Sequence, residues 1–335
     1  MQRMRWNWIL CGALAALPAL AITARAETCV TQSAMTAADR QAISQAALTL
    51  ASDMQANNTS AVQGLTIADL QGNFAAIANV VSTTAPHLKG GQPQIEQVYL
   101  LDGTSIKAGT DADFFCMLNK SENTVDFTIP QLPAGRYAFA MVRFQGDNNP
   151  WQLSFLMRQD GGVWKLGGLY PMALTSGGKD GLSYWREARA LASKQQDWAA
   201  WLAYQQARVL LMPAGFISST HQQKLDSEMT TATPPAVQNG VSDAAPLVIK
   251  NAAGQEFHFT SLGVDDFLGN ADIVAHLKVD ALGDANTARQ RNNDAMAALI
   301  AAHPDLRPVF HGVWIFTDAP GAAPYATESP MADIH

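Results

Sequence analysis

The stretch from Gly135 to Leu174 constrains the fold most, because it predicts three consecutive strands joined by two turns. Bulky side chains at Tyr137, Phe139 and Met141 alternate with smaller ones, and this period of two is typical of a β-strand. A second alternating run begins at Trp151. The Asp-Gly-Gly turn at 160–162 then lets the chain return as a third strand. We therefore expect three antiparallel strands in a row.

The first of these strands has one bulky face, and we assign that face to the protein interior. The next strand contributes to the same face either the set Trp151, Leu153 and Phe155 or the residues between them. The two choices differ by one residue of register, which turns every side chain of a strand over. The sequence leaves this choice open.

The chain before this stretch predicts helices followed by further strands. Apolar residues at helical spacing predict helices over residues 36–54 and 70–81, with a polar break at 57–64 between them. Short apolar runs bounded by Gly or Pro predict strands over residues 95–101, 111–118 and 124–129. Together with the three strands above, these elements predict one α-then-β module of residues 30–175.

The layout of this module is similar to the NTF2-like domains, the cone shape of SnoaL and ketosteroid isomerase. The resemblance lies in two helices before a curved antiparallel sheet and in the ending Asp160-Gly161-Gly162-Val163-Trp164-Lys165-Leu166, a Gly turn before a Trp-Lys strand. It implies a concave sheet face with a cavity under the helices. Isomerases of the family use a buried Tyr and Asp together. Tyr99, Asp113, Asp126 and Tyr137 are present without a recognisable signature, so no catalytic residue is transferred.

The rest of the chain predicts smaller units, and the predicted fold class is α+β. Residues 183–229 predict a helical hairpin segment after a Gly-rich joint, and residues 230–246, rich in Thr, Pro and Ala, predict a linker. Residues 247–318 predict a small α+β unit in the order β-β-β-α-β. Residues 319–335 contain three prolines and predict an irregular tail.

The first 26 residues have the order of a secretory signal peptide. Arg3 and Arg5 precede an apolar run, and Ala24 and Ala26 supply small residues before Glu27. A retained membrane anchor is the alternative, but the run is short for a span of about 20 residues. We expect cleavage after Ala26 and a periplasmic or secreted protein, with no transmembrane span after cleavage.

Charge argues against nucleic acid as a partner. Removal of the signal deletes three arginines and no acidic residue, so the formal net charge changes from −7 to −10. Binding of phosphates requires clustered Lys and Arg, and here the basic residues are scattered. The same composition disfavours anionic membrane surfaces.

The cysteines predict a disulfide. Cys11 lies in the predicted signal, which leaves Cys29 and Cys116 as an even pair in an oxidising compartment. We therefore expect these two residues to be joined.

No motif predicts a metal, a cofactor or a catalytic group. His258, His276 and His311, with Asp265, Asp266 and Asp272, are the most tempting ligand types, but they lack the spacing of known metal motifs. Neither a Gly-x-Ser-x-Gly elbow nor a phosphate-binding glycine loop occurs. We predict no metal site and no cofactor.

Three functions are compatible with these observations. The first is an exported, non-catalytic protein that binds a small apolar ligand or a cell-envelope protein. The second is an isomerase- or hydrolase-type enzyme with its site in the cone, and the third is an assembly or structural factor of the envelope. A pocket with a desolvated carboxylate would favour the enzyme, and an apolar pocket without titratable groups would favour binding.

We favour the binding function and expect its ligand between the helix at 70–81 and the sheet. The predicted lining is Tyr99, Tyr137, Phe139 and Trp151, around a hollow of about 300 Å³ or more.

We predict that the exported protein begins at Glu27. Mass spectrometry of the intact secreted or periplasmic protein is expected to give the mass of residues 27–335. Material that retains Met1 after export would contradict this prediction.

Overall fold

The stretch that constrains the fold most forms three consecutive antiparallel strands, as predicted. The computed structural model describes residues 27–118, 122–145, 149–265 and 269–335, so the predicted signal segment lies outside the described residues. The three strands are β5 (Gly135–Gln145), β6 (Trp151–Asp160) and β7 (Val163–Ala173). Gly161 and Gly162 both adopt positive φ in the turn between β6 and β7, a conformation that glycine adopts without steric cost.

These strands belong to a five-stranded antiparallel sheet with the order β1-β2-β5-β6-β7. Its other members are β1 (Thr28–Thr31) and β2 (Gln92–Gly103). β5 is therefore the central strand, and its side chains decide what packs on each face of the sheet.

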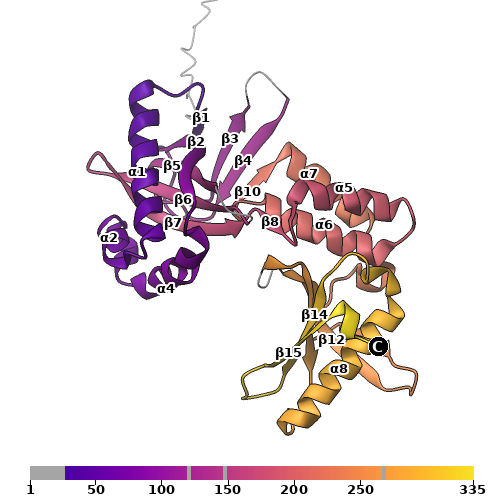
Figure 1. Cartoon of the computed structure of the whole chain (residues 1–335). Helices are drawn as coiled ribbons and strands as arrows, with labels where there is room; N and C mark the ends of the chain where they lie inside the picture. The colour runs from indigo at the N-terminus through magenta and orange to yellow at the C-terminus, as the bar shows by residue number, and fades with distance from the viewer. Residues whose placement is uncertain (1–26, 119–121, 146–148, 266–268) are drawn as a thin grey trace, which may run out of the picture.

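Helices cover one face of this sheet (Figure 1). They are α1 (Ala37–Gln55), α2 (Thr59–Gly64), α3 (Ala68–Gln71) and α4 (Phe74–Thr84), followed by the 3₁₀ helix η1 (Ala85–Leu88). Thr36 caps α1 by accepting a hydrogen bond from the backbone N–H of Asp39 at 3.1 Å. The buried residues Ile43, Leu50 and Met54 recur at helical spacing and face the sheet core.

The chain between α1 and β2 is more helical than predicted. The predicted polar break at 57–64 contains α2, which begins where the side chain of Asn58 accepts a hydrogen bond from the N–H of Ala61 at 3.2 Å. The single helix predicted over 70–81 is divided into α3 and α4 at Gly72 and Asn73, because glycine weakens a helix interior.

Both faces of β5 are buried, and the register decides which residues of β6 accompany each face. Ala140 pairs with Phe155, and both lie in the core under the helices. Phe139 pairs with Leu156 on the opposite face. The bulky face of β5 points away from the helices. On that face it lies beside the β6 residues that alternate with Trp151, Leu153 and Phe155, such as Leu156.

A second, three-stranded sheet covers the bulky face, in the order β10-β4-β3. It consists of β3 (Ala112–Met117), β4 (Thr124–Ile129) and β10 (Ile217–Ser219). The first two strands were predicted and the third was not. Phe127 of β4 contacts Phe139 of β5 edge to face, with ring centroids 5.5 Å apart. The N-terminal unit thus has three layers: helices, the large sheet and the small sheet.

The middle of the chain forms a helical segment, as predicted. A small ladder of β8 (Thr175–Ser176) and β9 (Lys179–Asp180) marks the Gly-rich joint, and α5 (Gly181–Ala192), α6 (Asp197–Leu211) and α7 (Thr220–Thr231) follow. α5 and α6 share one hydrophobic core with the C-terminal sheet. The stretch predicted as a linker contains the 3₁₀ helix η2 (Pro235–Val237).

The C-terminal unit is a five-stranded sheet with one long helix on it, and its strands lie in chain order. Its elements are β11 (Leu247–Lys250), β12 (Glu256–Asp265), β13 (Asp272–Lys278), α8 (Ala285–Ala302), η4 (Pro304–Leu306), β14 (Gly312–Asp318), β15 (Tyr325–Pro330) and η5 (Met331–Asp333). β13 and β14 are parallel, and α8 makes the crossover that such a pair requires. The predicted order β-β-β-α-β is present.

The tail from residue 319 is not irregular, which corrects that prediction. It forms β15, which pairs antiparallel with β14 at the edge of the sheet. Pro320 and Pro324 precede β15, and Pro330 is its last residue, so these prolines remove no hydrogen bond from the middle of the strand.

The protein is α+β, as predicted. Among the described residues, neighbouring strands of the sheets pair antiparallel, except that β13 and β14 are parallel. None of the helices in the described ranges is long and apolar enough to cross a membrane.

Cys29 of β1 and Cys116 of β3 form a disulfide, with their Cα atoms 5.3 Å apart, as predicted. The bond joins the large sheet to the small sheet.

We predict that removal of this disulfide destabilises the protein strongly. The two cysteines are 87 residues apart in sequence. The loop-entropy model then gives a loss of about 4.6 kcal/mol in the free energy of unfolding for the C29S/C116S double variant. Urea unfolding with and without reductant measures this loss. Two thiols that react in the native, unreduced protein would contradict the prediction.

Candidate functional site

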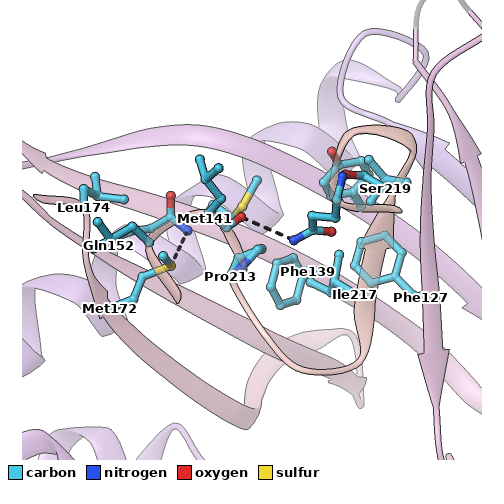
Figure 2. Close-up of a pocket in the computed structure, with 14 residues that line it drawn as sticks. Phe127, Phe139, Met141, Gln152, Met172, Leu174, Pro213, Ile217 and Ser219 are labelled. Atoms are coloured by element: carbon cyan, nitrogen blue, oxygen red, sulfur yellow. Dashed lines mark hydrogen bonds between the residues drawn. The ribbon is translucent and has the colours of Figure 1, made fainter. Parts of the chain in front are cut away.

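An apolar groove of about 260 Å³ lies on the face of the large sheet that points away from α1, and it is open to solvent on one side. Its floor comes from β2, β5, β6 and the end of β7: Tyr99, Phe139, Met141, Gln152, Met172 and Leu174. Its walls come from β4, β10 and the ends of α6 and α7: Val125, Phe127, Leu210, Leu211, Pro213, Ile217, Ser219 and Gln222. Figure 2 shows these side chains around the hollow. The groove is slightly smaller than the hollow of about 300 Å³ that the sequence led us to expect.

The chain between α6 and α7 closes one side of the groove for local reasons. α6 ends at Leu211, because Met212 is extended and Pro213 cannot continue a helix. The chain then pairs with β4 as β10, and Ser219 caps α7 by accepting a hydrogen bond from the N–H of Gln222 at 3.2 Å. The side chain of Gln222 donates back to the carbonyl of Leu211 at 3.3 Å. This loop therefore holds its apolar residues over the sheet.

The groove lining carries no charged side chain and no histidine. Tyr99 is its one titratable group, and burial raises the pKa of this phenol to about 12. At neutral pH Tyr99 is a neutral hydroxyl group. The groove thus offers apolar surface and neutral polar atoms.

The glutamine side chains are the main polar features of the lining. Gln152 is only 7% exposed, and its Nε2 donates to Ser154 Oγ at 3.1 Å and contacts Met172 Sδ at 3.8 Å (Figure 2). Within the described ranges, Gln222 Oε1 is buried and has no hydrogen-bond partner. A buried acceptor without a partner loses its hydration without compensation. A ligand that supplies a donor would remove this cost.

The structure brings two of the four predicted lining residues together. Tyr99 and Phe139 line the groove. Tyr137 does not, because its ring is buried and its hydroxyl donates to the carbonyl of Pro133 at 2.7 Å. Trp151 lies on the other side of the sheet and stacks on His87, with ring centroids 4.4 Å apart.

The structure shows the groove on the face opposite to the one under the helix at 70–81, where we predicted the ligand. That side of the sheet is filled by buried side chains such as Leu50 of α1, Val81 of α4 and Phe155 of β6. The small side chains of β5 on this face let α1 approach closely, and the described side chains between them are packed together. The groove lies on the opposite face instead.

Sequence reasoning missed the residues that come from distant segments, such as Phe127, Ile217 and Gln222. The one signal in the sequence that bears on this loop is Pro213, because proline cannot continue a helix. Nothing in the sequence of the three-residue strand β10 indicated that it would pair with β4.

The carboxylates considered for an isomerase do not reach the groove. Asp113 is exposed on the edge strand β3. Asp126 lies between Val125 and Phe127, which line the groove, so its side chain points to the other face of the small sheet.

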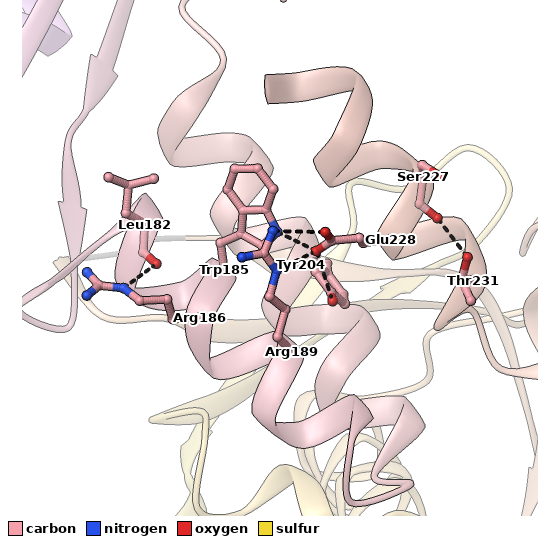
Figure 3. A network of polar contacts seen from close by, with 8 residues as sticks. All are labelled: Leu182, Trp185, Arg186, Arg189, Tyr204, Ser227, Glu228 and Thr231. Atoms are coloured by element: carbon pink, nitrogen blue, oxygen red, sulfur yellow. Dashed lines mark hydrogen bonds and ion pairs between the residues drawn. The ribbon is translucent and has the colours of Figure 1, made fainter. Parts of the chain in front are cut away.

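A separate polar network fixes α5, α6 and α7 to one another around Glu228 (Figure 3). Arg189 donates to both carboxylate oxygens, at 2.7 and 2.8 Å, and Trp185 Nε1 donates at 2.7 Å. The hydroxyl of Tyr204 lies 3.4 Å from the same carboxylate. The hydrogen bonds from Arg189 hold the pKa of Glu228 below its usual value. This network positions α7, whose first turn carries Gln222.

The histidines of the C-terminal unit pair with single carboxylates. His276 Nδ1 lies 2.8 Å from Asp318 Oδ2, and His311 Nδ1 lies 3.0 Å from Asp272 Oδ1. Asp272 also accepts a hydrogen bond from Trp314 Nε1 at 3.1 Å.

The remaining residues of that group do not converge on the pairs. His258 Nε2 lies 3.3 Å from Glu256 Oε2. Asp266 is outside the described residues. In the part of the chain that the structure describes, no three His, Cys, Asp or Glu side chains are placed to hold a metal ion together.

Comparison with family models, with curated proteins and with solved structures finds no match to this chain. The resemblance to NTF2-like domains therefore stays a prediction, and the groove has to be interpreted from its own chemistry.

We predict that Glu228→Gln lowers the free energy of unfolding by about 1 to 3 kcal/mol at neutral pH, because it replaces charge-assisted hydrogen bonds with weaker ones. The folded-state pKa of Glu228 is depressed, so its stabilisation is present above the unfolded pKa near 4.5 and is lost as the pH falls through the folded pKa. The difference between wild type and variant is expected to shrink below pH about 4.5. Urea unfolding at several pH values measures it.

Asp226→Asn is the matched control, because Asp226 lies on the same helix and forms an exposed ion pair with Arg208 at 2.9 Å. Its effect is expected to stay below about 1 kcal/mol. Equal effects of the two variants would contradict the structural role assigned to Glu228.

Proposed function

We propose that this protein is an exported, non-catalytic protein that binds a small apolar ligand in the groove between the large sheet and the α6–α7 loop. The observation that carries the proposal is the composition of the lining, which is mostly apolar and contains a buried acceptor, Gln222 Oε1, without a partner among the described residues. Apolar pockets with a few placed polar atoms are typical of small-molecule sites.

The groove favours binding over catalysis. An isomerase or a hydrolase of the predicted type needs a group that takes or gives a proton near neutral pH. Tyr99, with a pKa of about 12, stays protonated there, and the lining has no carboxylate, imidazole or amine. These side chains suit a ligand that is held rather than converted.

Export is part of the proposal. The signal-like order of the first 26 residues supports it, and so does the disulfide between Cys29 and Cys116, which fits an oxidising extracellular compartment. We propose a periplasmic or secreted location. The NTF2-like layout of residues 30–175 belongs to the proposal as well, since helices cover one face of an antiparallel sheet.

A cell-envelope protein as partner is the second candidate, and one observation favours it. Phe115 and Met117 project from the same side of β3, and each is 68% exposed. Two side chains form a small apolar surface compared with typical docking patches of several hundred Å². We therefore place the small ligand first.

We predict that the neutral fluorescent probe N-phenyl-1-naphthylamine binds the groove with a rise in its emission. Met141→Trp is expected to weaken binding at least about tenfold, because Met141 lies in the middle of the floor and a larger ring fills the hollow. Fluorescence titration measures both affinities, and thermal unfolding verifies that the variant is folded.

Met117→Trp is the matched control, since it adds the same ring to an exposed position outside the groove. It is expected to bind the probe like wild type. Absence of probe binding to wild type, or equal binding by Met141→Trp, would overturn the proposed site.

A further inference from the structure

Arg143 differs from the other arginines that the structure describes. Its Nε is buried and makes no hydrogen bond, and no carboxylate in the described ranges pairs with its guanidinium group. Arg289 also lacks a partner there, but it is exposed to solvent. The other described arginines donate to a side chain or to a backbone carbonyl: Arg40, Arg136, Arg158, Arg186, Arg189, Arg208, Arg291 and Arg307. A half-buried cation without an acceptor is costly.

The strand register places Arg143 beside one end of the groove. It follows Met141 by two residues on β5, so both side chains start from the same face of the sheet. Its Cα lies opposite that of Gln152 on β6. Side chains that start from directly opposed residues have Cβ atoms about 5 Å apart. Gln152 lines the groove, together with Met172 and Leu174 at the same end (Figure 2).

The groove runs diagonally across the sheet from this end. Tyr99 on β2 pairs with Phe139, and Gln152 on β6 pairs with Arg143, four residues farther along β5. Two strand spacings across and four residues along separate Tyr99 from Gln152 by about 16 Å. Arg143 therefore lies beside the Gln152 end of the floor, and Tyr99 lies at the far end.

We propose that the ligand is a single-chain carboxylate, such as a medium-chain fatty acid anion. Its carboxylate pairs with the guanidinium of Arg143, and its chain lies over Met141 toward Tyr99. The inference rests on the proposed function, which supplies the apolar part of the site, and it adds the charge and position of the head group.

The chemistry of the head group follows from Arg143. A guanidinium group matches a carboxylate with two parallel hydrogen bonds, and such charge-assisted pairs are about twice as strong as neutral ones. An alcohol of the same chain length buries the same apolar surface but leaves the positive charge without a counter-charge. An alkylamine brings a second cation to the same place. Glu96 on the neighbouring strand β2 is exposed and forms no ion pair with Arg143, so no carboxylate of the described residues occupies the cation.

The experiment is competition against bound N-phenyl-1-naphthylamine by decanoate, decanol and decylamine at pH about 8, where the carboxylate is ionised. Decanoate and decylamine are kept below their critical micelle concentrations, and decanol is kept below its solubility limit. Decanoate is expected to compete at least about tenfold better than decanol, and decylamine least well. Equal competition by decanoate and decanol would overturn the head-group assignment. Failure of the probe itself to bind would instead overturn the proposed function.

Substitutions of Arg143 test the assigned residue. Arg143→Gln is expected to remove the advantage of decanoate over decanol while binding of the neutral probe persists, and Arg143→Lys is expected to restore part of that advantage because it keeps the charge. Arg289→Gln is the matched control, since it removes an exposed arginine, and it is expected to compete like wild type. An Arg143→Gln variant that binds the probe and still prefers decanoate would overturn the inference.

Discussion

The alternation along β5 is the constraint on which the rest of the N-terminal unit depends. On one face, Ala138 and Ala140 let α1 approach the sheet closely, and the space is filled by side chains of α1, α4 and β6. On the other face, Phe139 and Met141 are too large for a flat contact and require a second layer that can bend around them. The small sheet provides that layer through the rings of its own strands, of which Phe127 is the nearest. A central strand with two such different faces produces a three-layer unit.

The groove exists because the small sheet does not cover the whole bulky face. β10 is only three residues long, and beyond it the chain turns into α7. The uncovered part of the large sheet is roofed by the loop between α6 and α7, which is held by the cap at Ser219 and by the carboxylate of Glu228. α5 and α6 in turn share their core with the C-terminal sheet. The shape of the groove therefore depends on a segment that packs on both units.

The sequence was sufficient for the parts of the fold that local periodicity determines. The alternating run at 135–174 gave three strands in the right order, and the cysteine pair gave the disulfide, since both are local or compositional signals. Periodicity says that the faces of β5 differ, but it does not say which neighbour covers each face. We therefore expected the ligand cavity on the face under the helices, whereas the groove lies on the other face of the sheet. β10 was missed because three residues carry no period, and Trp151 was assigned to the site because the register between neighbouring strands cannot be read from either strand alone.

The unpaired guanidinium group of Arg143 determines which head group a ligand of the groove should carry. The chain carries a formal net charge of −7, and nearly all of its described arginines have found a carboxylate or a carbonyl acceptor. The Nε of Arg143 is buried without such a partner, so this nitrogen has lost its hydration without compensation beside one end of an apolar surface. A carboxylate brought to that end would accept a hydrogen bond from this nitrogen and balance the charge, and an uncharged ligand would not balance the charge. Because the anion interacts with the folded state alone, its binding free energy adds to the stability of the protein. Selectivity for the head group and stabilisation of the N-terminal unit then have the same physical origin.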